Sequence, residues 1–366
     1  MNWGLPPLPP NFGAALRDVH AKRPESRMAA AERLGRAEGD EREGAVGGLR
    51  TLASDLHPGV RATALAALGL LGGELELPVV LAGFTDPAAE VREFAALAAA
   101  QIGGHGAVTA LRTALTNEAP EVRFQAAAGL ADLVPDEAAG DLLPLLADPD
   151  PEVRSLVISA LAILAEPHLV GHLAGALDDD HPNVRLEAAL ALGHFGDPRA
   201  EAPLLRALHN RMRVAEVARA LSELGCRKGN DEIAEIAAAW LTPPHLRAEL
   251  GAALVVLDDD RGAPLLRRVL SGLRSDARSY AVELAREVEA DAVVPDLVRL
   301  TKRPRGVDYF TLIEALATFS SRSPDASAAL SQLGQRTDAV GEAARRASAN
   351  TLADPVTITK ERARVP

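Results

Sequence analysis

The chain has 366 residues, and 48% of them are hydrophobic but only 3% aromatic, so Ala and Leu must supply most of any core. The formal net charge of −12 argues against a nucleic-acid partner, because affinity for phosphate backbones comes mainly from Lys and Arg. Cys226 is the single cysteine, which excludes a disulfide framework and a thiolate zinc site and indicates a reducing, cytoplasmic environment.

Residues 1–13, "MNWGLPPLPPNFG", form a proline-rich N-terminal extension. They contain no basic stretch followed by an apolar one, so they do not read as a signal peptide. A proline-rich docking motif and a plain extension both remain open for this segment. No apolar run in the chain approaches the roughly 20 residues that span a bilayer, so we expect no membrane insertion.

A 31-residue repeat follows this extension, and its clearest mark is an arginine preceded by valine. The arginines with this spacing are Arg61, Arg92, Arg123, Arg154 and Arg185. Six residues before each stands an acid or an amide, namely Asp55, Asp86, Asn117, Asp148 and Asp179. A proline lies three residues before the arginine in four of these five units.

The same register extends in both directions. Arg27 occupies the slot upstream, and Arg247 and Arg278 occupy it downstream, while Glu216, Tyr309 and Val340 fill the remaining slots. About eleven units therefore tile residues 14–354 as one continuous domain. Residues 37–44, "AEGDEREG", read as a charged loop that covers a three-residue insertion. Residues 355–366 form a basic C-terminal tail.

Each unit contains two helical patterns. The second starts at the proline, which suits a first helical turn, and its apolar residues recur at helical spacing. The first is the preceding apolar run, such as "AEAPLLRALH" at residues 200–209. A pair this short cannot bury its own apolar face and must stack on its neighbours. The sequence therefore predicts an all-α fold, an α-solenoid of about eleven helix pairs.

The pattern D-x-x-P-x-V-R-x-x-A-A-x-A-L-G resembles the HEAT repeat, in the roughly 31-residue form of phycocyanobilin-lyase-type proteins. The resemblance is clearest between Asp55 and Gly196. It implies antiparallel helix pairs whose second helices line a concave face. It implies less about function, since scaffolds, lyases and enzymes share this repeat. HEAT-like deoxyhypusine hydroxylases carry His-Glu dyads for iron, and no histidine here is followed by glutamate.

The recurring Asp and Arg slots predict a stacking ladder, because a catalytic group is needed once and a stacking group at every interface. The Asp can accept backbone N–H bonds at the start of the second helix. The Arg can hold that carboxylate or the one of the neighbouring repeat. His181, beside an acidic cluster, falls at a variable turn position rather than in a metal site. His168 and His172 have a chelating i,i+4 spacing but no third ligand, so we expect no metal and no cofactor.

A partner-binding surface is predicted from the positions that vary one, two, five and nine residues after the arginine slot. Its candidate residues are Phe94, Leu97, Phe124, Gln125, Leu156, Glu249, Tyr280, Glu283, Glu287 and Glu314. An apolar stretch followed by an acidic one suits a basic amphipathic segment of another protein. The alternative is that the apolar residues pack between repeats and the acids form a solvated face.

These features favour a monomeric, non-enzymatic scaffold or adaptor for a partner protein. A second hypothesis is a phycobilin-lyase-like chaperone or another ligand-binding HEAT protein, which the resemblance permits. A third hypothesis, nucleic-acid binding, is opposed by the charge.

Overall fold

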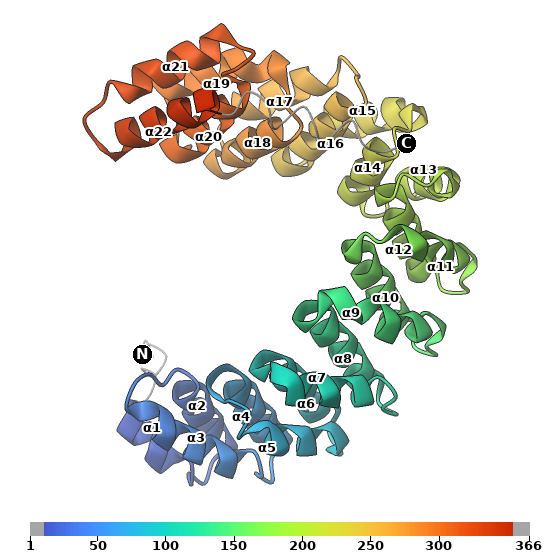
Figure 1. Ribbon diagram of the computed structural model, residues 1–366, viewed down its shortest axis with the longest axis vertical. Helices are drawn as coiled ribbons and strands as arrows, with labels where there is room; N and C mark the ends of the chain where they lie inside the picture. Colours follow the sequence, from blue (N-terminus) through green and yellow to red (C-terminus); the bar gives the residue numbers. More distant parts are fainter. Residues whose placement is uncertain (1–10, 354–366) are drawn as a thin grey trace, which may run out of the picture. The chain divides into compact units, whose positions relative to one another are not determined.

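The computed structural model describes residues 11–353, which form α-helices joined by short turns and contain no β-strand (Figure 1). Among the described residues, helices α1 to α22 alternate as the first and second helices of successive repeats, which confirms the predicted all-α solenoid fold. No helix in the described part of the chain is long and apolar enough to cross a membrane. Contacts divide the chain into two compact units, with the boundary between Ala188 and Ala189.

In each pair the first helix is the shorter or more irregular one. The first helices are α1 (Phe12–Asp18), α3 (Glu41–Leu52), α5 (Leu77–Ala82), α7 (Gly104–Ala114), α9 (Pro135–Leu142), α11 (Val170–Gly175), α13 (Glu201–His209), α15 (Asn230–Ala238), α17 (Gly262–Leu270), α19 (Val294–Lys302) and α21 (Pro324–Gly334). Several are extended by single 3-10 turns, at Gly83–Thr85, Leu143–Ala147, Pro167–Leu169, Ala176–Asp178, Pro198–Ala200, Arg227–Gly229 and Asp291–Val293.

The second helices carry the arginine slots and form a row within each unit. They are α2 (Pro24–Leu34), α4 (Pro58–Leu71), α6 (Ala89–Ile102), α8 (Pro120–Leu133), α10 (Pro151–Leu164), α12 (Pro182–His194), α14 (Val214–Glu223), α16 (Pro244–Val256), α18 (Ser275–Glu287), α20 (Tyr309–Phe319) and α22 (Ala339–Ala353). In the first unit α2, α4, α6, α8 and α10 pack in sequence, and in the second α14, α16, α18, α20 and α22 do so. Most begin at proline, which lacks a backbone N–H; the first residue of a helix has no partner within the helix for that N–H, so no hydrogen bond is lost.

The charged segment at residues 37–44 is only partly a loop, so that prediction was wrong in its second half. Helix α3 begins at Glu41, and Glu41 and Glu43 lie in its first turn, where acidic side chains stabilise the helix dipole. At the N-terminus α1 begins at Phe12, capped by the Asn11 side chain, which accepts the N–H of Ala14. The rest of the predicted extension, and the predicted basic tail, lie outside the described residues.

Small residues let the second helices approach closely. A Cβ added to Gly69 of α4 would lie 2.8 Å from the Cα of Ala98 in α6. Gly129 of α8 and Gly193 of α12 are similar, since a Cβ there would lie 2.7 Å from the Cβ of Ala100 and 2.9 Å from that of Ala220, respectively. Leucine, valine and alanine side chains fill the remaining space between helices.

A ladder of arginine–aspartate pairs joins the helix pairs of the first unit. Arg123 donates from Nε and Nη2 to the two carboxylate oxygens of Asp148 in the next repeat, both at 2.7 Å. Its Nη1 donates to the backbone oxygens of Asn117 (2.8 Å) and Glu118 (3.0 Å) in its own turn. One guanidinium group therefore fixes the local turn and binds the neighbouring repeat in a bidentate geometry.

The same aspartate residue also contacts the arginine that follows it in its own repeat. Oδ1 of Asp148 also accepts the N–H of Asp150 at 2.8 Å, and the Asp148 carbonyl accepts Nη1 of Arg154 at 2.7 Å. The same arrangement joins Arg27 to Asp55, Arg61 to Asp86 and Arg154 to Asp179. The ladder thus runs through successive turns as alternating side-chain and backbone bonds.

Two exceptions show that the residue at the acidic slot has two separate roles. It accepts a backbone N–H in its own turn, and it binds the arginine of the preceding repeat. Asn117 still accepts the N–H of Ala119 (2.9 Å) in its turn, but it has no charge to offer Arg92. Arg92 instead binds Glu121, from Nε at 2.8 Å. Among the described residues, Arg185 donates to two carbonyl oxygens of its own turn, those of Asp179 and Asp180, and the residue 25 positions later is Asn210 rather than an acid.

The arginines lower the pKa of the ladder carboxyls. The hydrogen bond from Arg27 holds the pKa of Asp55 below its ordinary value. Burial on its own raises the pKa of Asp148, but the bonds from Arg123 and from the amide of Asp150 outweigh it, and the net direction is downward. Because the folded pKa lies below the unfolded value, these groups stabilise the fold above about pH 4 and lose that contribution as the pH falls.

Replacing Gly69 by Ala should destabilise the first unit by about 1–3 kcal/mol, because the new methyl group forces α4 and α6 apart. Gly47→Ala is the matched control, since a Cβ on this exposed glycine of α3 meets nothing within 4 Å. That control should stabilise the protein by about 0.4–1 kcal/mol. Urea unfolding measures both changes, and equal stability of the two variants would contradict the close approach.

Arg123→Ala should lower the free energy of unfolding by about 3–5 kcal/mol, because it leaves the buried Asp148 carboxylate without its counter-charge. Arg185→Ala, at the equivalent slot without a carboxylate partner among residues 11–353, should cost much less. The difference between wild type and Arg123→Ala should narrow below about pH 4, as Asp148 becomes protonated. A constant difference between pH 7 and pH 3 would contradict the role given to this ion pair.

Candidate functional site

The ladder stops in the second unit because its acidic slots change. The residues there are Asn210, Leu241, Gly272 and Arg303, which follow Arg185, Glu216, Arg247 and Arg278 by the same spacing. Arg247 is buried and donates to the carbonyl oxygens of Ala237 and Ala239, both at 2.9 Å. Burial without a nearby carboxylate lowers its pKa.

A different ionic network joins the repeats of the second unit, at the turns that follow the second helices. Arg261 binds Asp259 in its own turn (2.7 Å) and Asp231 of the preceding repeat (2.9 Å). Arg322 binds two acids of the preceding turn, Glu289 (2.7 Å) and Asp291 (2.8 Å). The 31-residue pattern did not reveal this network, because its members do not recur in every unit.

A pocket of about 380 Å³ lies on the second helices of the first unit and contains two of the predicted partner-binding residues, Phe124 and Gln125. Its acidic lining residues are Glu93, Glu121, Asp150 and Glu152. The predicted residues Phe94, Leu97 and Leu156 are partly buried side chains of the same helices and are not part of this lining.

A larger pocket, of about 480 Å³, is formed by α14, α16 and α18 in the second unit; we call it the α16 groove. Its apolar lining includes Ala252, Ala253, Val256 and Leu284, and Val256 is 46% exposed. Five carboxylates line it, from Glu223, Glu249, Asp258, Glu287 and Glu289, against one basic side chain, Arg219. Two of the predicted partner-binding residues, Glu249 and Glu287, therefore share one groove.

The five carboxylates of the α16 groove are not equally free. Asp258 pairs with Arg227 and Glu289 with Arg322, each at 2.7 Å, while Glu223 lies 3.4 Å from His194. Among the described residues, no cation forms an ion pair with Glu249 or Glu287. Sequence reasoning missed Glu223 and Glu289, which fall outside the positions that it singled out.

Tyr280 holds Glu249 in place at one side of this groove. Its hydroxyl donates to Oε1 of Glu249 at 2.7 Å, and its ring packs on His245 with 5.5 Å between centroids. Burial and the bond to Glu249 raise the pKa of Tyr280 to about 12. The remaining predicted acids, Glu283 and Glu314, are exposed, and Glu314 pairs with Arg286 at 3.1 Å.

The histidines considered as metal ligands have other surroundings. The backbone N–H of His181 donates to Asp179 at 2.8 Å, in the turn before α12. His168 lies 3.2 Å from Glu166. Within residues 11–353, no group of three or more His, Cys, Asp or Glu side chains is placed to hold a metal ion.

Comparison with known proteins supports the repeat assignment. The family model for HEAT repeats matches residues 77–162, 139–222 and 168–256. A search of curated proteins finds no match to the chain.

Two solved structures share the fold at low identity. The chain is similar to the Escherichia coli protein YibA, with 19% identity and a TM-score of 0.52 over 68% of this chain and 93% of that one. It is also similar to a chain of the Kap95:Nup1 complex, with 14% identity and a TM-score of 0.54 over 94% of this chain and 56% of that one. These likenesses concern the fold alone. With the helix pairs and the ladder described above, the family match identifies residues 77–256 as HEAT repeats.

Proposed function

We propose that this protein is a non-enzymatic scaffold that binds a basic amphipathic segment of a partner protein in the α16 groove. The observation that carries the proposal is the pairing of an apolar lining with five carboxylates in one groove. An amphipathic helix would place its apolar face on the alanine and valine side chains and its Lys or Arg side chains near the acids.

The unpaired acids are the most informative part of this groove. Glu249 and Glu287 have no cationic partner among the described residues, so their charges are available to a ligand. Tyr280 restrains Glu249 by a neutral hydrogen bond, which orients the carboxylate without cancelling its charge. Such preorganisation reduces the entropy lost on binding.

The first unit supports the same chemistry. Its smaller pocket combines the Phe124 ring with Glu93 and Glu152, again an apolar group beside acids. The chain also shares its fold with a chain of the Kap95:Nup1 complex, which is an assembly of proteins. The strongly negative net charge of the whole chain favours encounter with a basic partner.

A synthetic amphipathic peptide with Lys on one helical face and Leu on the other should bind the full-length protein, as measured by fluorescence anisotropy. Glu287→Lys should weaken this binding about tenfold or more at low salt, and less at high salt, because this carboxylate lines the groove and its exposed charge is screened. Circular dichroism checks that the fold is retained.

Glu235→Lys is the matched control, since this exposed acid lies on α15, outside the α16 groove. It should leave peptide binding close to that of wild type. A peptide with Glu in place of Lys should bind weakly to all variants. If Glu235→Lys and Glu287→Lys lose affinity equally, the attraction is a general effect of the protein's charge and the α16 groove is not the binding site.

A further inference from the structure

At one slot where the ladder pattern expects an acid, the chain has the positively charged residue Arg303. Arg278 is followed, 25 residues later, by Arg303, where Arg61, Arg123 and Arg154 are followed at the same spacing by Asp86, Asp148 and Asp179. The repeat therefore brings a second cation to the position at which the first unit supplies an anion.

Arg278 itself is buried without a counter-charge. It is 2% exposed, the lowest value among the buried polar and charged side chains of the described chain. Its guanidinium group donates to the carbonyl oxygens of Leu270 (3.1 Å), Gly272 (2.5 Å) and Arg305. No carboxylate among residues 11–353 pairs with it, and burial together with the charge of Arg305 lowers its pKa. Carbonyl dipoles satisfy its hydrogen bonds but leave its charge in need of an anion.

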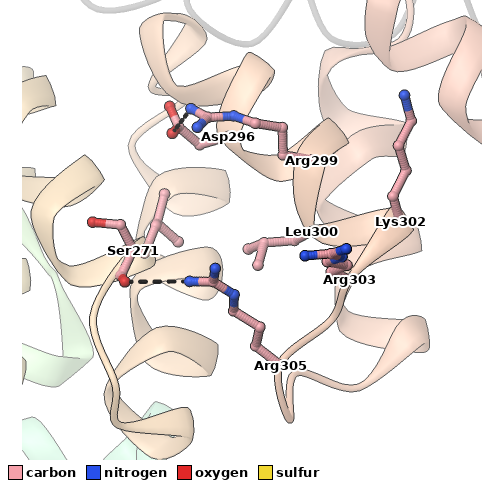
Figure 2. A pocket seen from close by; sticks show the side chains of 8 residues that line it. Ser271, Asp296, Arg299, Leu300, Lys302, Arg303 and Arg305 are labelled. Atoms are coloured by element: carbon pink, nitrogen blue, oxygen red, sulfur yellow. Dashed lines mark hydrogen bonds and ion pairs between the residues drawn. The ribbon is translucent and has the colours of Figure 1, made fainter.

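An open pocket of about 440 Å³ lies at this position, between α17, α19 and the turn that follows α19 (Figure 2). Its lining residues are Leu270, Ser271, Asp296, Arg299, Leu300, Lys302, Arg303 and Arg305. Four of these eight side chains are basic and one is acidic, in a protein that is otherwise strongly acidic.

The one acid of the pocket is already neutralised. Asp296 pairs with Arg299 and with Arg267, the latter at 3.3 Å. Figure 2 shows Arg299 turned toward Asp296, and Arg305 reaching toward the Ser271 carbonyl, to which it donates at 3.5 Å. Lys302, Arg303 and Arg305 form no ion pair with any acidic side chain in the described part of the chain. All three are exposed.

The backbone keeps the three cations together. Arg305 and Gly306 both have positive φ, 52° and 89°, and a non-glycine residue rarely adopts this conformation. A Cβ on Gly306 would lie 2.8 Å from the Cβ of Ser275, so the turn packs closely on the first turn of α18. The buried Arg278 donates a hydrogen bond to the carbonyl oxygen of Arg305. This bond stabilises the turn at Arg305 and Gly306 and satisfies one donor of Arg278. Strain of this kind is often retained at binding sites.

We propose that this pocket binds a phosphate group, which supplies the negative charge that the ladder lacks beside Arg278. Arginine forks match the tetrahedral oxygens of phosphate in bidentate geometry, and lysine adds a point charge. A phosphate group carries close to two negative charges at neutral pH, so it balances several cations better than one carboxylate would. The site is distinct from the α16 groove, because the two share no lining residue.

Inorganic phosphate is the probe for this site. Titration calorimetry and thermal unfolding of the full-length protein, in phosphate and in chloride of matched ionic strength, should show saturable binding and a melting temperature raised only by phosphate. Lys302→Gln with Arg303→Gln should weaken binding about tenfold or more, since charge-assisted hydrogen bonds are lost. Both residues are exposed, so the variant should fold as wild type does.

Arg206→Gln is the control, because this exposed arginine of α13 does not line the pocket. This variant should bind phosphate as wild type does.

Arg303→Asp supplies a second test. By placing a carboxylate in the ladder slot, it should abolish the stabilisation by phosphate while leaving the melting temperature in chloride at least as high as that of wild type. Absence of saturable binding to wild type, or equal binding by wild type and Lys302→Gln with Arg303→Gln, overturns the proposal. A phosphate monoester that displaces inorganic phosphate would support it and would show that the site also accepts a phosphate attached to a larger molecule.

Discussion

Each helix pair of this chain is too short to bury its own apolar face, and burial between successive pairs is the constraint on which the other features depend. It requires small residues where second helices meet, as at Gly69 and Gly193. A repeated polar contact helps to fix the offset between neighbours, because hydrophobic burial is non-directional. In the first unit the arginine–aspartate ladder provides that contact.

Much of this organisation could be predicted from the sequence. A spacing of 31 residues between arginines, with an acid six residues before each, indicated both the helix pairs and the ladder. The pattern could not tell whether Arg123 binds the acid of its own turn or that of the next repeat, since both are consistent with the same spacing. The structure places Asp148 of the next repeat at its guanidinium group. The start of α3 was missed because Glu41 and Glu43 read as loop residues, although acids also stabilise the first turn of a helix.

The candidate sites were harder to predict. Phe124 with Gln125, and Glu249 with Glu287, were singled out from their positions and do line common pockets. Glu223, Asp258 and Glu289 complete the α16 groove from helix ends and turns, where no periodic rule applies. The repeat pattern did not predict the pocket beside Arg303, because that pattern leads one to expect an acid, not an arginine, at this slot. In a repeat protein, a departure from the pattern is informative when it reverses the charge at a position where several other repeats make the same ion pair.

The ladder also bears on how such a chain can change in length. The rungs from Arg61, Arg123 and Arg154 each join the arginine to an aspartate 25 residues later, and that aspartate belongs to the turn of the next arginine slot. Deleting or duplicating the 31-residue segment 124–154 would therefore bring another arginine–aspartate pair into the same contact, whereas duplicating a segment that carries Asn117 would not. Where successive rungs are alike, such a chain can gain or lose modules by recombination while the ionic contact at the junction is kept.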